Sequence, residues 1–243
     1  MSDTSPRQYA RTQRLTLGEP RNISVSPDGA HVLFLRSRAG DDGVNCLWSL
    51  DVATRTETLV ADPHVLLGNA DADDLPPEER ARRERLREGA GGITSFSLDS
   101  AHEQVAFTLS GRLFAGLVTQ SGTHSIHELA VRGPVFDPRI DPTGRRIAYV
   151  VGNSLHCVDI DGGNERVIAS PATMGDGENV SWGSAEFIAA EEMGRYRGFW
   201  FSPDGTRVAV CRVDESPVQV WHIADPANPD RAPHSVRYPA AGT

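Results

Sequence analysis

Two adjacent carboxylates, Glu191 and Glu192, are the residues of this 243-residue sequence whose types and spacing suggest chemistry. They stand after Ala-Ala and before Met-Gly, and an aromatic run follows. Successive side chains diverge on a regular strand, so both glutamates can face one ligand only from a loop or a short helical turn. Held close together, they repel one another and raise at least one pKa, unless a cation or water lies between them. Two interpretations follow: a solvated helix face, or a clamp that binds an ammonium group through charge-assisted hydrogen bonds.

Composition excludes several classes of function. Hydrophobic residues make up 39% and charged residues 23%, as in ordinary globular proteins. A net charge of -9 argues against a nucleic-acid surface, which requires clustered positive charge. The three cysteines form no C-x-x-C pair, which indicates reduced, buried side chains. The N-terminus has no apolar signal region, and no run approaches the ~18 apolar residues of a membrane span. We therefore expect a cytoplasmic protein with no nucleic-acid or membrane partner.

A recurring sequence motif supplies the elements that must position the glutamates. It consists of Ser-Pro-Asp-Gly or a variant, a short apolar strand, a second strand that ends near Asp, and a polar turn. Copies start at Ile23, Ile93, Pro138 and Phe199, and the second is the weakest because its turn lacks proline and glycine. Four strands in roughly 40 to 45 residues is the period of a β-propeller blade. The sequence thus predicts an all-β fold, a partial β-propeller of about four four-stranded blades over residues 21–243, after a leader at 1–20.

Two insertions depart from that period, and loops of repeat proteins commonly carry function. Residues 73–90 predict a short helix, with proline near its first turn and early glutamates at its positive end. This helix has few apolar residues to bury, so it is either solvated or an arginine-bearing element that orders on a ligand. The second insertion, about 180–198, contains the two glutamates. Both precede the start of a blade, so we expect them to project toward the same end of the propeller.

Three segments resemble one known family. Residues 190–203 closely resemble the double-glutamate segment of the dipeptidyl peptidase IV family, in the prolyl oligopeptidase group of serine peptidases. The spacing to the aromatic pair is most similar to the dipeptidyl peptidase 8 and 9 branch and its bacterial relatives. Residues 83–93 resemble the arginine-helix segment of that branch, and 237–242 resemble the sequence after the double-glutamate blade.

The resemblance implies an eight-bladed propeller that covers the enzyme's own C-terminal α/β-hydrolase domain. Such enzymes remove dipeptides with proline or alanine second from peptides with a free N-terminus. Glu191 and Glu192 would bind the substrate α-ammonium. Arg85 or Arg87, with Arg83 a near alternative, would bind a substrate carbonyl or steady the glutamates. The resemblance implies no cofactor and leaves a homodimer open.

The sequence departs from the whole family in one large respect, because no G-x-S-x-G nucleophile elbow occurs in it. Zinc-ligand spacings and phosphate loops are also missing, so we predict neither catalytic nor metal-binding residues here. The simplest explanation is a fragment that ends inside the propeller, lacks the hydrolase domain and is inactive alone. One alternative is a non-catalytic propeller that serves as a protein-interaction scaffold. Another is the propeller of an oligopeptidase or acylaminoacyl peptidase of the same group, which lack the double glutamate.

Overall fold

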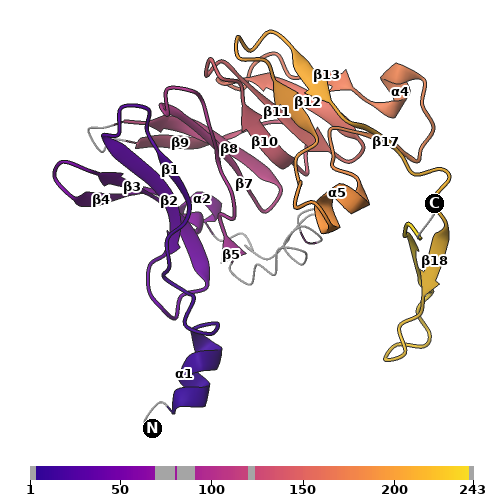
Figure 1. Ribbon diagram of the computed structural model, residues 1–243, viewed down its shortest axis with the longest axis horizontal. Coiled ribbons are helices and arrows are strands. Elements are labelled where there is room, and N and C mark those ends of the chain that lie inside the picture. The colour runs from indigo at the N-terminus through magenta and orange to yellow at the C-terminus, as the bar shows by residue number, and fades with distance from the viewer. Residues whose placement is uncertain (1–3, 69–79, 81–90, 120–123, 241–243) are drawn as a thin grey trace.

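Antiparallel sheets make up most of the protein. The computed structural model describes residues 4–68, 80, 91–119 and 124–240. Its sheets follow one another in chain order, from indigo through magenta to orange in Figure 1, and lie side by side in an arc. This arrangement confirms the all-β partial propeller expected from the repeats.

Each of the first three repeats contributes four strands to one sheet, and strands adjacent in the chain are adjacent in that sheet. The first contains β1 (Arg21–Val25), β2 (His31–Ser37), β3 (Val44–Asp51) and β4 (Thr56–Ala61). The second contains β6 (Ser97–Leu98), β7 (Gln104–Leu109), β8 (Arg112–Val118) and β9 (His124–Leu129). The third contains β10 (Phe136–Ile140), β11 (Arg146–Val151), β12 (Ser154–Asp159) and β13 (Arg166–Ala169).

Short elements flank the first sheet. Helix α1 (Ser5–Arg11) precedes it and buries none of its residues, and α2 (Pro63–Leu67) follows it. Strand β5 (Gly91–Gly92) lies parallel to the start of β3, so the chain that follows the predicted 73–90 helix rejoins the first sheet. Apart from Arg80, that predicted helix lies outside the described residues.

We call the first strand of each repeat its inner strand; these are β1, β6, β10 and β15 (Phe199–Phe201). The turn that follows the inner strand has the same design in all four repeats. The backbone N–H of its fourth residue donates to the carbonyl oxygen of its first residue, at 2.8 to 3.2 Å. That fourth residue has a left-handed φ in each repeat; it is Gly29, His102, Gly144 or Gly205. The second copy closes its turn without glycine because Asp99 Oδ1 accepts the N–H groups of Glu103 and Gln104, both at 2.9 Å. The weakest copy in sequence therefore still begins a complete four-stranded sheet.

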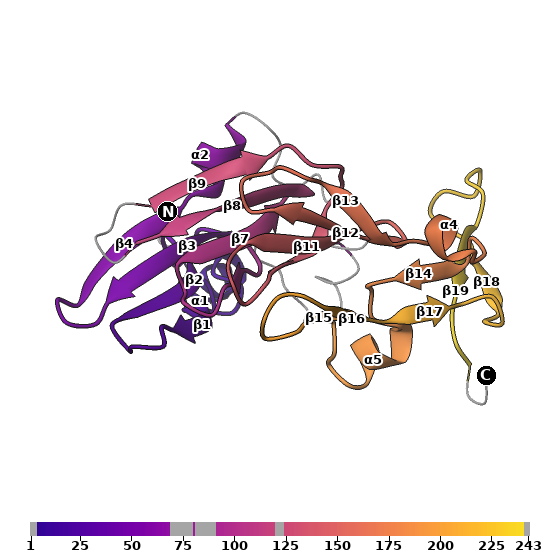
Figure 2. The same ribbon diagram turned by 90° about the horizontal axis from the view of Figure 1, so that it is seen from above.

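The fourth repeat differs from the expected four-stranded blade. Its strands form three separate two-stranded ribbons, β14 with β17, β15 with β16, and β18 with β19. Their bounds are β14 (Val180–Trp182), β15 (Phe199–Phe201), β16 (Val208–Val210), β17 (Arg212–Asp214), β18 (Val220–Ile223) and β19 (His234–Arg237). Figure 2 shows the β18–β19 hairpin at the far end of the molecule. Every residue of β18 is exposed, Trp221 to 48%, and Arg237 of β19 joins the hairpin to the preceding part of the repeat, because its Nη2 donates to Asn179 Oδ1 at 3.1 Å.

The core lies between neighbouring sheets. Alternate residues of β7 face opposite sides: Phe107 packs with the first sheet and Ala106 with the third. The cluster between the third and fourth repeats is the smallest, and it consists of Ala148, Val150, Leu155 and Phe199. Phe199 of β15 is fully buried there, so the strand that follows the two glutamates is fixed to the body of the protein.

The cysteines were expected to be buried, and Cys211 departs from that expectation. Cys46 and Cys157 are buried, Cys211 is half-buried, and all three are free. Burial, with a smaller contribution from the Asp62 carboxylate, raises the pKa of Cys46 to about 11, so this thiol stays protonated at neutral pH. No helix in the part of the chain that the structure describes is long and apolar enough to cross a bilayer.

A buried tyrosine of β11 joins the loop before β13 to the segment between β9 and β10. The Tyr149 hydroxyl donates to Glu165 Oε1 at 2.7 Å, and the same oxygen accepts Arg132 N at 2.9 Å. The ring of Tyr149 stacks on His156, with 5.6 Å between the centroids. Burial raises the pKa of the Glu165 carboxyl, but the bonds from Tyr149 and Arg132 outweigh it and hold the pKa below its usual value. Ionised Glu165 therefore stabilises the folded state.

We expect Tyr149→Phe to lower the free energy of unfolding by about 1 to 2 kcal/mol at pH 7, because a hydrogen bond to a charged but partly exposed carboxylate is lost. Since the pKa of Glu165 is lower in the folded state, its contribution is present above the unfolded value, about 4.3, and is lost as the pH falls through the folded value. Urea denaturation at pH 7 and near pH 3 measures both. Tyr9→Phe, on the unburied helix α1, is the control. Equal losses at the two pH values would contradict the role given to Glu165.

Candidate functional site

The double-glutamate segment interrupts one strand of the fourth repeat. β14 and β15 pair end to end with β17 and β16, which are separated only by Cys211. Cys211 O accepts a hydrogen bond from Gly183 N at 3.0 Å, and Cys211 N donates one to Gly198 O at 2.8 Å. Gly183 and Gly198 thus share the place opposite Cys211. Residues 184–197, which we call the excursion, leave the sheet between them and fall within the predicted insertion at about 180–198.

The base of the excursion is closed by close backbone contact. Ser184 and Arg197 form an isolated antiparallel bridge. A Cβ atom on Gly198 would lie 2.3 Å from Gly183 O and 2.5 Å from Ser184 C, so only glycine fits there. The excursion is therefore held at both ends by the strand that it interrupts.

Helix α5 (Phe187–Glu191) forms in the excursion because an acidic residue caps it. Glu186 Oε2 accepts Ile188 N and Glu186 Oε1 accepts Ala189 N, each at 2.6 Å. These bonds satisfy two of the backbone N–H groups that a helix start leaves unpaired. Ala189 and Ala190 are buried, so the helix rests on the body of the protein through its small side chains. Figure 2 shows α5 beside β15, β16 and β17.

Arg195 fixes the returning half of the excursion. Its backbone N–H donates to Ala189 O at 2.8 Å, and its Nη1 donates to Arg197 O at 2.8 Å. Its Nη2 lies 3.7 Å from Glu186 Oε1, and its guanidinium carbon lies 5.9 Å from the ring centroid of Trp200. One arginine thus joins the helix cap, the helix end and the next strand.

The two glutamates stand at the end of this anchored turn. Glu191 is the last residue of α5 and Glu192 is its C-cap, and both are exposed, as is Met193. Of the two alternatives, a loop or a short helical turn, the structure shows the helical turn. No hydrogen bond or ion pair of the Glu192 carboxylate occurs within the described ranges. Carboxylates accept hydrogen bonds and donate none, so an exposed pair on a fixed backbone suits a cationic ligand with several N–H donors.

The predicted arginine partners are not placed. Arg85, Arg87 and Arg83 lie outside the described residues, so their approach to the glutamates remains a prediction. Among the residues that are described, no group of three or more histidine, cysteine or carboxylate side chains is arranged to hold a metal ion.

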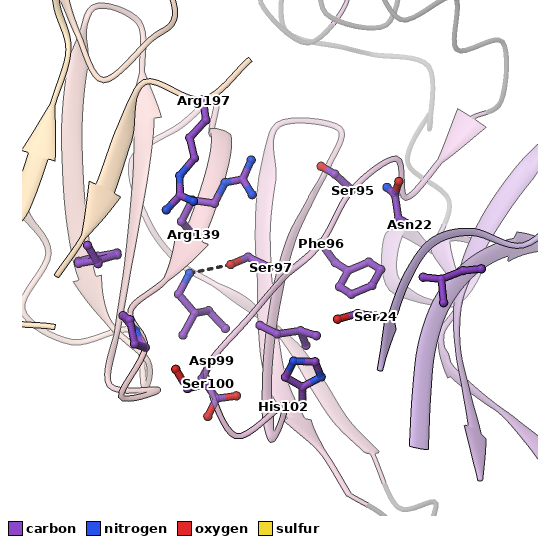
Figure 3. A pocket seen from close by; sticks show the side chains of 15 residues that line it. Asn22, Ser24, Ser95, Phe96, Ser97, Asp99, Ser100, His102, Arg139 and Arg197 are labelled. Carbon is purple, nitrogen blue, oxygen red and sulfur yellow. Dashed lines mark hydrogen bonds between the residues drawn. The ribbon is translucent and has the colours of Figure 1, made fainter. Parts of the chain in front are cut away.

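A hollow of about 630 Å³ lies along the inner strands of the four repeats. It is lined from β1, β6, β10 and β15, and by Arg197 at the base of the excursion. Figure 3 shows Arg139 and Arg197 with their guanidinium groups side by side at one end, and Asp99 and His102 at the other. The excursion thus bears Glu191 and Glu192 at the end of its helix, and it bears Arg197, which lines the hollow, at its base.

Sequence reasoning missed Arg139 and Arg197 as site residues. Arg197 stood inside the segment that resembles the known family, and Arg139 stood just before a recognised turn. Each looks like an ordinary surface arginine in the sequence. The signal that could have found them is that each arginine stands in or just before the inner strand of its repeat. That position indicates a shared site only when the repeats are known to place their inner strands together.

Comparisons with known proteins place these features in a family. The family model described as "Dipeptidyl peptidase IV (DPP IV) N-terminal region" matches residues 103–243. The chain is similar to mouse (Mus musculus) dipeptidyl peptidase 8, with 25% identity over 251 residues, which cover 90% of the chain and 28% of that protein. It is also similar to human (Homo sapiens) dipeptidyl peptidase 8, with 24% identity over 246 residues, 89% of the chain and 27% of that protein. The chain thus spans less than a third of the length of these curated relatives.

Proposed function

Because the chain belongs to the family of dipeptidyl peptidase IV N-terminal regions, we propose that it is the substrate-selecting propeller portion of a serine-type dipeptidyl aminopeptidase. The parent enzyme releases Xaa-Pro and Xaa-Ala dipeptides from the N-terminus of peptides. In this proposal residues 1–20 are a leader and 21–243 an incomplete propeller, and the parent's own α/β-hydrolase domain carries the nucleophile. The proposed location is the cytoplasm.

The observation that carries the proposal is the position of Glu191 and Glu192 at the end of an anchored helical turn. The α-amino group of a peptide has a pKa near 8, so it is mainly a cation at neutral pH. An ammonium has three N–H donors, and two carboxylates can accept all of them. The capped helix and Arg195 hold the backbone that bears the carboxylates, which reduces the ordering required when the ligand binds.

A fixed ammonium site works as a ruler. If it stands at a set distance from the nucleophile, the peptide bond after the second residue is the one presented for cleavage. This is catalysis by positioning and not by bond chemistry. We propose that Arg85 or Arg87 binds a substrate carbonyl or steadies the glutamates from the other side.

Modification of the substrate tests the proposal directly. The full-length parent protein is expected to release dipeptides from a Xaa-Pro amide with a free N-terminus. N-acetylation of the same substrate removes the charge and is expected to lower kcat/KM at least tenfold, because a charge-assisted hydrogen bond contributes about 1.5 to 3 kcal/mol. Release of product is followed with a chromogenic amide. Equal rates on the free and acetylated substrates would reject the ammonium clamp and favour an oligopeptidase or acylaminoacyl peptidase.

The non-catalytic scaffold makes a different set of predictions. A full-length protein that hydrolyses no Xaa-Pro amide, and whose function survives substitution of both glutamates, would support the scaffold and overturn the enzyme. The serine nucleophile provides a second check, because a parent sequence without a G-x-S-x-G motif would be incompatible with the proposed hydrolase domain.

A further inference from the structure

The hollow along the inner strands is electrically polarised. Arg139 and Arg197 lie at one end and Asp99 at the other (Figure 3). Asp99 Oδ1 accepts hydrogen bonds from two backbone N–H groups of its own turn, so this carboxylate already serves to stabilise the second repeat. The arginine end is different, because part of its hydrogen-bonding capacity is unused.

Arg139 is aimed into the hollow by an irregular strand. The pairing of β10 with β11 shifts register between Phe136 and Arg139, and Asp137 has a left-handed φ of 45°. Bulges of this kind redirect side chains. Asp137 Oδ1 accepts Arg139 Nε at 2.8 Å and lies 2.6 Å from Arg139 Nη2. Arg139 Nη1 has no partner among the residues described, and neither has the buried Asp137 Oδ2.

Arg197 reaches the same place from the excursion. Its Nε donates to Phe199 O at 2.6 Å, and its guanidinium carbon lies 5.8 Å from the ring centroid of Trp200. Its Nη1 and Nη2 have no hydrogen-bond acceptor within the described part of the chain. Burial, and then the positive charge of Arg139, lower the pKa of Arg197. Two half-buried guanidinium groups beside one carboxylate leave one net positive charge that water only partly solvates.

We propose that Arg139 and Arg197 form a subsite that binds a carboxylate of the peptide whose amino end is held by Glu191 and Glu192. The carboxylate is either the C-terminus of a short peptide or an acidic side chain. Guanidinium groups bind carboxylates through paired N–H donors, and the free Nη atoms of both arginines are available for this. Binding also reduces the repulsion between the two positive charges that lie side by side at this end of the hollow.

The inference rests on the proposed function, and it narrows the substrate class to acidic peptides or to short peptides with a free C-terminus. A peptide that enters with its amino end at the excursion would place a later residue near the arginines. Because an extended chain covers about 3.3 to 3.6 Å per residue, the gain from a C-terminal carboxylate should occur only within a narrow range of peptide lengths.

Binding of matched Xaa-Pro peptides to the full-length protein tests the subsite. The peptides carry a fluorophore on an internal side chain, span about four to ten residues, and end either as a free acid or as an amide. A third set is amidated and has one internal glutamate in place of glutamine. For the best length we expect the free acid, the glutamate peptide, or both to bind about tenfold more tightly than the neutral peptide, which corresponds to one charge-assisted contact. Which set shows the gain identifies the source of the carboxylate.

Variants assign the gain to the two arginines. Arg197→Gln and Arg139→Gln should each abolish most of it without changing the affinity for neutral amides, and Arg197→Lys should restore part of it. Arg207→Gln, an exposed arginine that does not line the hollow, is the matched control and should retain the gain. A gain that survives in Arg139→Gln/Arg197→Gln, or no gain at any length, would overturn the subsite. Equal loss of affinity for acidic and neutral peptides would also overturn it, since the arginines would then not distinguish peptides by their carboxylate.

The two proposals fail in distinguishable ways. N-terminal acetylation of the same peptides reports on the glutamates, whereas C-terminal amidation reports on the arginines. Sensitivity to acetylation without sensitivity to amidation leaves the proposed function intact and rejects the carboxylate subsite. Insensitivity to acetylation rejects the ammonium clamp and with it the premise that this subsite serves a substrate held by its amino end.

Discussion

Replacement of both Glu191 and Glu192 with glutamine is expected to lower kcat/KM for Xaa-Pro amides by about 10³-fold in the proposed parent enzyme. Each carboxylate contributes a charge-assisted hydrogen bond of about 1.5 to 3 kcal/mol, and each 1.4 kcal/mol is a factor of ten in kcat/KM. Glutamine preserves the size of the side chain and removes only its charge. Each single variant should therefore lose about 10- to 100-fold. Steady-state kinetics on a chromogenic dipeptide amide measures the loss.

Two controls separate binding of the ammonium from damage to the fold. Glu215→Gln changes another exposed glutamate of the fourth repeat, and it should leave kcat/KM unchanged. The pH profile is the second control. Wild-type kcat/KM should fall as the substrate amine deprotonates above about pH 8, and the double variant should show a much weaker fall because it no longer discriminates the charged form. Wild-type kinetics in the double variant would leave the two glutamates as ordinary surface charges.

Gly198→Ala is expected to lower the free energy of unfolding by about 3 kcal/mol and to abolish binding of the peptide amino end. The new Cβ would lie 2.3 Å from Gly183 O and 2.4 Å from Gly183 C, and both neighbours are backbone atoms that cannot rotate away. The base of the excursion would have to open, which breaks the hydrogen bond from Cys211 N to Gly198 O. The helix that bears the glutamates would then lose its fixed position. Urea denaturation and peptide binding measure the two effects.

Gly177→Ala is the matched control for this substitution. Its added Cβ would meet nothing within 4 Å, so the stability should change by less than about 0.5 kcal/mol. A Gly198→Ala protein with wild-type stability would mean that Gly183 and Gly198 do not share the place opposite Cys211. Normal stability with lost binding would instead show that the excursion shifts without unfolding the sheet.

Several features of this protein were predictable because their causes are local. The turn residues set φ and ψ within four positions, so Pro-Asp-Gly and Pro-Thr-Gly mark the start of a repeat. Strand alternation then follows from side-chain period, and four such units indicate a propeller. For Glu191 and Glu192 the sequence allowed a loop or a short helical turn, since adjacent side chains diverge on a regular strand. The resemblance to the family rested on the same contiguous segment.

Other features depend on contacts that the repeat pattern did not reveal, some within one turn and some between residues that are distant in the chain. His102 takes the place of a turn glycine because Asp99 satisfies the backbone N–H groups that follow it, which the weak second copy did not reveal. The strands of the fourth repeat pair as separate two-stranded ribbons, and β18 is fully exposed, which the repeated pattern did not predict. The excursion interrupts a strand because Gly183 and Gly198 both form backbone hydrogen bonds with Cys211.

The sequence by itself therefore determined the repeats, the fold class and the family, and it identified the two glutamates as candidate site residues. Only the tertiary structure decided how the excursion is anchored and which side chains meet in the hollow. Arg139 and Arg197 are 58 positions apart in the chain, yet the positive charge of Arg139 lowers the pKa of Arg197. Local propensity determines each turn and strand, whereas charges from different repeats meet only where packed sheets bring their inner strands to one centre.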